Sequence, residues 1–296
     1  MERCGGRWSG SGRMNMSEQL TAISHQPSGK AFGTDRQAQG QGARIAIVAA
    51  MEREVAPLIR GWKVREIVSD GRRYRLFEGV DAVLICGGIG AQAARRAAEA
   101  VIEEARPGRV ISVGFAGALD SRIKVADVME PRVVVNAADG SRTDTGSGQG
   151  TLVSYAGVAD WNQKERLARA YAAEAVDMEA AAVAQAAQAH EIEFAALKVI
   201  SDAADFAMPA TERFVSGDGR FRPVGFLVYV AVRPWLWGST IALARNSAKA
   251  SRALSAATAN YLERESTNRR SRVSPMNPPK QSLGGAPSAP SVSRSQ

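Results

Sequence analysis

Short apolar runs alternate along this chain with alanine-rich stretches of helical length, and this alternation restricts the fold more than any other feature. The apolar runs that predict buried strands are residues 44–50, 82–86, 109–113 and 194–200, with weaker strand signals at 125–135 and 152–154. The predicted helices are residues 91–105, 164–171 and 178–190. Strands that alternate with helices favour an α/β fold, with one central sheet flanked by helices.

Composition divides the chain into a core and two polar ends. Residues 1–42 are rich in Gly, Ser and Gln, and residues 263–296 are rich in Ser, Pro and Arg. We therefore predict a disordered leader over 1–42, one folded domain over 43–262 and a disordered basic tail over 263–296. The net charge is +8, of which the leader carries +2 and the tail +4, so +2 remains for the domain.

The charge and the cysteines restrict the partners and the compartment. Because most of the positive charge belongs to the ends and forms no recognised motif, we expect no nucleic-acid partner. Cys4 and Cys86 do not resemble a disulfide framework, which indicates a reducing compartment. The leader contains no apolar signal segment. These features predict a cytoplasmic protein.

The longest apolar stretch, residues 226–244, approaches the length of a membrane span. Arg233 and Pro234 lie at its middle, where a charge is expensive in a bilayer, so we favour a pair of helices broken at Pro234. A second interpretation is peripheral membrane contact through 226–252, with tryptophans at headgroup level and basic residues beside them.

Two acidic clusters follow predicted buried elements. Asp177 and Glu179 precede the alanine-rich helix, and Asp202 ends the apolar run 194–200. Open α/β sheets bind ligands at the carboxyl ends of their strands, so these acids are expected at one edge of the sheet. Carboxyl groups placed there predict acid–base or hydroxyl-binding chemistry on a polar small molecule.

These clusters belong to an ordered series of motifs. The series is RIAIVAAMEREV at 44–55, GIG at 88–90, GFAG at 114–117, VDME at 176–179 and ISDAAD at 200–205. In this order they resemble the nucleoside phosphorylase/nucleosidase family, above all its methylthioadenosine/S-adenosylhomocysteine nucleosidase branch. The resemblance covers about residues 44–206 and implies a three-layer sandwich around a mixed, twisted sheet.

The resemblance implies that the chain is an enzyme that cleaves an N-glycosidic bond and releases adenine. Asp202 matches the general acid that protonates the departing purine, and Ser201 stands beside it. We expect burial among apolar groups to keep this carboxyl protonated. Glu179 matches the residue that accepts hydrogen bonds from the ribose hydroxyls, and Met178 matches the residue that packs on the sugar.

Four further residues complete the predicted site. Glu54 matches the base that activates the attacking water in the hydrolytic branch. Val153 and Leu152 lie where the family contacts the purine. Gly88 either lets the backbone approach a ligand oxygen or forms a tight turn, and the sequence leaves both readings open.

Departures from the family pattern leave the nucleophile open between water and phosphate. Residues 87–90 read GGIG where the family often has Ser-Gly-Ile-Gly, and residues 114–118 lack the usual serine of that loop. No metal or resident cofactor is implied, although phosphate would be a co-substrate in a phosphorolytic reaction. The family also implies a homodimer or a larger homo-oligomer.

The sequence leaves two questions open: which substrate is bound, and whether it is turned over. The Trp-bearing segment after Asp205 is similar to hopanoid-associated members linked to adenosylhopane, so the substrate is either of the methylthioadenosine/S-adenosylhomocysteine type or of the adenosylhopane type. A different hypothesis is a phosphorylase-like protein that binds nucleosides without turnover, associated with a membrane surface. The altered glycine loops and residues 226–244 motivate it.

Overall fold

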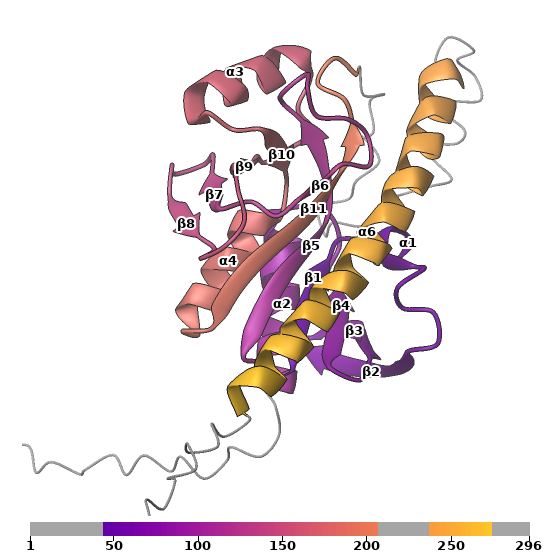
Figure 1. The fold of residues 1–296 in the computed structure, drawn as a ribbon, viewed down its shortest axis with the longest axis vertical. Coiled ribbons are helices and arrows are strands. Elements are labelled where there is room, and N and C mark those ends of the chain that lie inside the picture. Colours follow the sequence, from indigo (N-terminus) through magenta and orange to yellow (C-terminus); the bar gives the residue numbers. More distant parts are fainter. Residues whose placement is uncertain (1–43, 207–236, 274–296) are drawn as a thin grey trace, which may run out of the picture. The chain divides into compact units, whose positions relative to one another are not determined.

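The computed structural model describes residues 44–206 and 237–273, which form an α/β domain (Figure 1). Its strands are β1 (Ile45–Ala49), β2 (Lys63–Ser69), β3 (Arg72–Glu78), β4 (Ala82–Cys86), β5 (Arg109–Ala118), β6 (Val128–Met129), β7 (Val133–Asn136), β8 (Arg142–Asp144), β9 (Thr151–Ser154), β10 (Ala175–Asp177) and β11 (Glu193–Asp202). Its helices are α1 (Glu52–Val55), α2 (Ala91–Ala105), α3 (Trp161–Tyr171), α4 (Ala180–Ala189) and α6 (Trp237–Val273).

The strands form the mixed sheet expected from the sequence. Their order is β2-β3-β4-β1-β5-β10-β9-β7-β8, and β11 pairs with β5 and β6. The central strands β4, β1, β5 and β11 are parallel, so their carboxyl ends lie at one edge of the sheet. The antiparallel hairpin of β2 and β3 extends the sheet beyond β4. The sequence did not indicate this hairpin, because most of β2 is exposed and lacks an apolar run.

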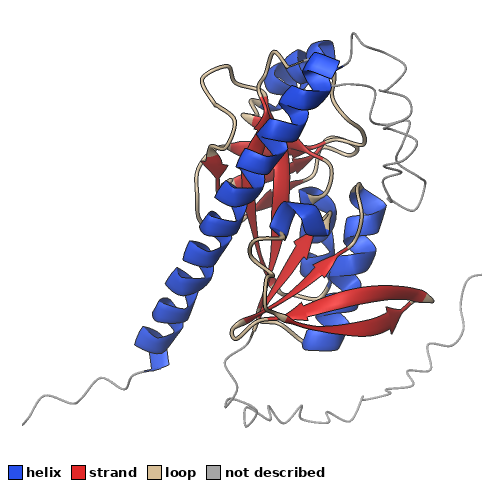
Figure 2. Ribbon diagram, turned by 90° about the vertical axis from the view of Figure 1, so that its right-hand side faces the viewer, coloured by secondary structure: helices blue, strands red, loops and turns tan. Residues whose placement is uncertain are grey.

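Alternate residues of the central strands build two cores on opposite faces of the sheet. Ala46 and Val48 of β1 pack with the alanines of α2 and α4, whereas Ile45 and Ile47 pack with Leu254 of α6. This alternation follows from the two-residue period of a strand. The small alanine side chains let α2 and α4 approach each other and the sheet closely. The sheet therefore lies between two helical layers, the predicted three-layer arrangement (Figures 1 and 2).

Helix α6 runs along the second face of the sheet and continues to Val273, past the predicted domain end at 262 (Figure 2). Residues 263–273 are thus helical and bear contacts, although we expected them in a disordered tail. The predicted break at Pro234, the leader and the rest of the tail lie outside the described residues. Among the residues that are described, no helix is both long and apolar enough to cross a membrane.

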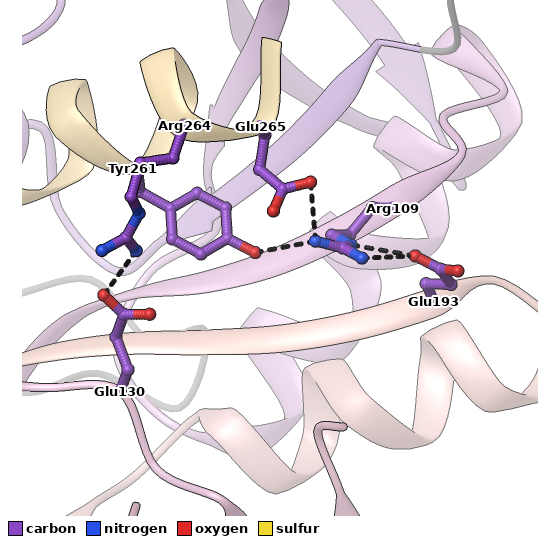
Figure 3. A network of polar contacts seen from close by, with 6 residues as sticks. All are labelled: Arg109, Glu130, Glu193, Tyr261, Arg264 and Glu265. Atoms are coloured by element: carbon purple, nitrogen blue, oxygen red, sulfur yellow. Dashed lines mark hydrogen bonds and ion pairs between the residues drawn. The ribbon is translucent and has the colours of Figure 1, made fainter. Parts of the chain in front are cut away.

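A network of polar contacts, here called the anchor network, attaches α6 to the sheet (Figure 3). Its members are Arg109, Glu193, Glu130, Tyr261, Arg264 and Glu265. The guanidinium of Arg109 lies 2.6 Å from Glu193 and 2.8 Å from Glu265, and it donates a hydrogen bond to the Tyr261 hydroxyl. Arg264 pairs with Glu130 at 2.6 Å. Because Arg109 begins β5 and Glu193 begins β11, the Arg109 contacts hold α6 at the amino-terminal edge of these strands, whereas Glu130 follows β6, which pairs with Lys198 and Val199 further along β11.

Candidate active site

A cavity of about 990 Å³ opens at the carboxyl ends of the central strands. Five of the residues that the sequence predicts for the site line it: Glu54, Met178, Glu179, Ser201 and Asp202. They come from α1, from the turn between β10 and α4 and from the end of β11. The second long wall is α6, which contributes small and apolar side chains such as Leu243, Ala244 and Ala248. The fold thus brings both predicted acidic clusters into one space.

Asp202 reaches the cavity through an irregularity in β11. The register with β5 shifts between Ile200 and Asp202, so Ser201 is an extra residue in the ladder. Such a bulge redirects the side chains that follow it, and here both Ser201 and Asp202 face the cavity. The Ser201 hydroxyl donates a hydrogen bond of 2.7 Å to Asp202 Oδ1. Gly117 makes room for the carboxylate, because a Cβ atom at position 117 would lie 2.8 Å from Oδ2.

The second oxygen of Asp202 has a partner that the sequence did not suggest. Lys164 Nζ lies 2.5 Å from Asp202 Oδ2 and 2.8 Å from the carbonyl oxygen of Ala203. Both side chains are buried, yet Lys164 also lines the cavity. We expected Asp202 among apolar groups alone, and the structure instead pairs it with an ammonium group. The expectation missed this contact because 38 residues separate the two side chains along the chain.

Glu179 is held by backbone donors at the start of two helices. Its Oε1 accepts a hydrogen bond of 2.8 Å from the Gly90 amide, which begins α2, and its Oε2 accepts one from the Met178 amide. Burial, followed by the charge of Asp177, raises the pKa of Glu179 to about 7, while Lys198 and the backbone donors act in the opposite direction. Asp177, the last residue of β10, itself accepts a hydrogen bond from the amide of Ala180, the first residue of α4.

Glu54 is a second carboxyl group of the cavity whose pKa is raised. Burial, followed by the charge of Glu179, raises its pKa to about 8, and Lys198 partly opposes this. Its Oε2 atom is buried and has no hydrogen-bond partner among residues 44–206 and 237–273. Helix α6 fixes the backbone here, because the Ser251 hydroxyl donates a hydrogen bond of 2.9 Å to the Glu54 carbonyl oxygen. A carboxyl group with a pKa near neutrality and a free oxygen in a cavity is suited to accept a proton from a nucleophile.

Lys198 lies beneath these carboxyl groups as a buried counter-charge. Its Nζ is 2.8 Å from Asp177 Oδ2 and donates a hydrogen bond of 3.0 Å to the Ser112 hydroxyl oxygen. A Cβ atom at Gly114 would lie 3.6 Å from this Nζ and 3.4 Å from Glu54 Oε2, so both groups lie beside the backbone of Gly114. The sequence gave one signal for this residue, a single lysine inside the otherwise apolar run 194–200.

Three predicted contacts do not line the cavity. Leu152 and Val153 are fully buried in β9, where they pack in the hydrophobic cores. The wall nearest to them in sequence is formed instead by residues 156–159, after the strand ends. Gly88 has a φ of 105° and donates its amide to the Ala50 carbonyl oxygen, so the structure assigns it the turn, and its neighbour Ile89 lines the cavity.

Comparisons with known proteins agree with this architecture. Residues 44–162 and 152–218 match the model of the family described as the phosphorylase superfamily. A 96-residue stretch is 35% identical to the 5′-methylthioadenosine/S-adenosylhomocysteine nucleosidase of a Marinomonas species, and it covers 31% of this chain. The same stretch covers 41% of that relative, so the chain matches less than half of its length.

Solved structures of low sequence identity show the same fold. A Helicobacter pylori 5′-methylthioadenosine/S-adenosylhomocysteine nucleosidase in complex with a pyrrolidinol compound has a TM-score of 0.56 at 18% identity, and the match covers 77% of this chain and all of that one. A mutant of the Helicobacter pylori nucleosidase with 5′-methylthioadenosine in the active site has a TM-score of 0.54 at 20% identity, over 74% of this chain and all of that one.

Proposed function

Because this chain belongs to the phosphorylase superfamily, we propose that it cleaves the N-glycosidic bond of an adenine nucleoside and releases adenine. The observation that carries the proposal is the convergence of Asp202, Glu179 and Glu54 on one cavity at the carboxyl ends of the sheet. Each of these acids comes from a different element, so their meeting is a property of the fold and not of local sequence.

The proposed mechanism gives each acid one task. Asp202 donates a proton to a ring nitrogen of the base, which makes the base a better leaving group. Glu179 accepts hydrogen bonds from the ribose hydroxyls and orients the sugar. Its negative charge also favours the oxocarbenium-like transition state at C1′. Met178, beside Glu179, packs against the sugar.

Glu54 supports water as the nucleophile. Its raised pKa, about 8, suits a base that removes a proton from water, and its free Oε2 atom is available for that hydrogen bond. A phosphate dianion at this place would be repelled by the neighbouring carboxylates. Arg53 and Arg252 also line the cavity, and they are the feature that favours phosphorolysis as the alternative.

The size and the wall of the cavity suggest the class of 5′ substituent. About 990 Å³ is at the upper end of small-molecule sites, so the cavity has room for more than a nucleoside alone. Leu243, Ala244 and Ala248 of α6 offer an apolar surface to that substituent. We therefore propose a substrate with an apolar 5′ group, from a methylthio group up to the hopane-type lipid.

The test measures products from purified protein. 5′-Methylthioadenosine, S-adenosylhomocysteine and a lipid-linked adenosine are each incubated with and without phosphate, and adenine and the sugar product are identified. We expect adenine and a free ribose derivative in both buffers. A ribose-1-phosphate product would replace hydrolysis by phosphorolysis. Absence of adenine from every substrate would overturn the proposed activity.

The Lys164–Asp202 ion pair favours one competing function, a nucleoside-binding protein without turnover. A carboxylate that is already engaged with an ammonium group suits a binding site as well as a proton donor. Calorimetric titration with 5′-methylthioadenosine distinguishes the two functions. A pure binder keeps its affinity in Asp202→Asn and shows no turnover in the parent, whereas the proposed enzyme shows turnover that this substitution abolishes.

Two properties of the assembly belong to the same proposal. We propose a homodimer, to be measured by light scattering of the full chain. We also propose peripheral contact with membranes through 226–252. In the described part of this segment, Ile241 is an exposed large apolar side chain, and sedimentation with anionic vesicles tests its contribution through Ile241→Ser.

A further inference from the structure

Lys164 occupies a position that packing alone does not explain. It is the fourth residue of α3, a helix that is capped at Asp160 by a capping box. A cation in the first helical turn lies at the positive end of the helix dipole, where it is disfavoured by about 0.3–1 kcal/mol. Burial of an ammonium group adds a further cost unless a partner compensates. The chain nevertheless places Lys164 beside Asp202, at the wall of the cavity.

The contacts around the pair engage both carboxylate oxygens of Asp202. Asp202 Oδ1 is engaged by the Ser201 hydroxyl and Oδ2 by Lys164 Nζ at 2.5 Å. In this arrangement Lys164 Nζ is the donor that is hydrogen-bonded to Oδ2. A departing purine that protonates at a ring nitrogen therefore draws on Lys164 as well as on Asp202.

We propose that Lys164 is a positioning residue that acts through Asp202 and supplies the proton which Asp202 hands to the leaving base. This inference rests on the proposed N-glycosidic cleavage. One proton moves from Lys164 Nζ to the Asp202 carboxylate and from the carboxyl group to a ring nitrogen of the base. The electron pair of the C1′–N bond leaves with the base, and water forms the new bond to C1′ while Glu54 takes its proton. Lys164 is then a neutral amine, and solvent in the open cavity protonates it again.

The experiment removes the amine and returns it from solution. Lys164→Ala is assayed for adenine release from 5′-methylthioadenosine, alone and with methylammonium or tetramethylammonium chloride at equal ionic strength. Both cations carry a positive charge, but only methylammonium carries a proton that it can donate. The cavity beside position 164 gives the small cation access.

We expect kcat of Lys164→Ala to fall about 10²–10⁴-fold, the range for loss of acid catalysis, with a much smaller change in KM. Methylammonium should recover kcat by at least one tenth of the logarithm of the fold-loss, and tetramethylammonium should not. Arg169→Ala is the matched control, because it removes a cation of the same helix that pairs only at the surface with Glu165. It should keep the parental kcat.

Lys164→Gln guards against a variant that fails to fold, since its amide can still donate a hydrogen bond to Asp202. Thermal unfolding verifies that both variants are folded. Three results overturn the proposal: an unchanged kcat in Lys164→Ala, equal rescue by both cations, or no rescue by methylammonium in either variant. A parent protein that releases no adenine overturns the proposed function itself, so the two failures are distinguishable.

Discussion

The two ends of the central strands use charge in opposite ways. At the amino-terminal edge, the anchor network holds α6 through ion pairs whose side chains are partly exposed, from 22% to 68%. At the carboxyl edge, Lys164–Asp202 and Lys198–Asp177 are nearly sealed from solvent, with side-chain exposures of 7% or less. Exposed ion pairs contribute little to stability, whereas burial of an ion pair costs desolvation energy. A chain that keeps two buried pairs beside one cavity concentrates costly charge where a reaction can use it.

The largest effect on stability is expected from Lys198→Met. Removal of the ammonium group leaves Asp177 buried without its counter-charge, and breaking one partner of a buried pair costs about 3–5 kcal/mol. Urea unfolding monitored by circular dichroism measures the free energy of unfolding. A decrease in the free energy of unfolding below about 1 kcal/mol, as for surface ion pairs, would mean that the ion pairs at the two edges do not differ in strength.

The second prediction concerns pH and Glu54→Gln. The pKa of Glu54 is about 8 in the folded state and 4.5 for an ordinary glutamate. Between these values the unfolded state binds fewer protons, so this carboxyl group lowers stability by about 1.4 kcal/mol per pH unit as pH rises. Its contribution is fully present below pH 4.5 and is lost above about pH 8.

Glutamine does not titrate and removes this loss. The stability of Glu54→Gln relative to the parent should therefore increase by about 2 kcal/mol between pH 6 and pH 8. Urea unfolding at both pH values measures the difference, and Glu52→Gln at an exposed position of the same helix is the control. A constant difference between the variants would mean that Glu54 does not carry the shifted titration.

The third prediction tests the space beside Asp202. Gly117→Ala places a methyl group 2.8 Å from Asp202 Oδ2, so the carboxylate must move. Such overpacking costs about 1–3 kcal/mol of stability, and we expect adenine release to slow because the acid is displaced. Gly238→Ala, where no atom of the described part of the chain lies within 4 Å of the added atom, is the control. Parental activity in Gly117→Ala would show that the position of Asp202 is not critical.

The smallest effect is expected at the anchor network. Arg264→Ala removes the surface pair with Glu130 and should lower the free energy of unfolding by about 0.2–1 kcal/mol. The difference should shrink in about 1 M salt, because exposed charges are screened. Chemical unfolding with urea in low and high NaCl measures it. A loss as large as that of Lys198→Met would remove the distinction between the two edges.

Regions of the molecule also differ in how far the sequence could predict them. The strands with apolar runs and the alanine-rich helices were predictable, because burial on both faces of a sheet leaves a continuous local pattern. The convergence of Glu54, Glu179 and Asp202 followed from their positions after strands and from the ordered motifs. The hairpin of β2 and β3 lacked such a run and was missed.

The partners of the acids could not be predicted, because they depend on contacts between distant segments. Lys164 looks like an ordinary residue of a polar helix until the fold places it against Asp202. Leu152 and Val153 were expected at the purine, but the alternation of β9 buries both in the cores and leaves the cavity to the loop that follows. One position along the chain decides whether a side chain faces solvent, core or cavity.

A single helix joins the two edges. Ser251 of α6 lies at the cavity beside Glu54, and Glu265 of the same helix lies in the anchor network, about 21 Å away along the helix axis. Because a helix is stiff, a tilt around its anchored end displaces the opposite end. A tilt of about 5° around the fixed end would shift the opposite wall by about 2 Å, roughly the width of a methyl group. Because Ser251 is hydrogen-bonded to the Glu54 carbonyl oxygen, mutations in the anchor network can therefore change both the width of the cavity and the position of Glu54.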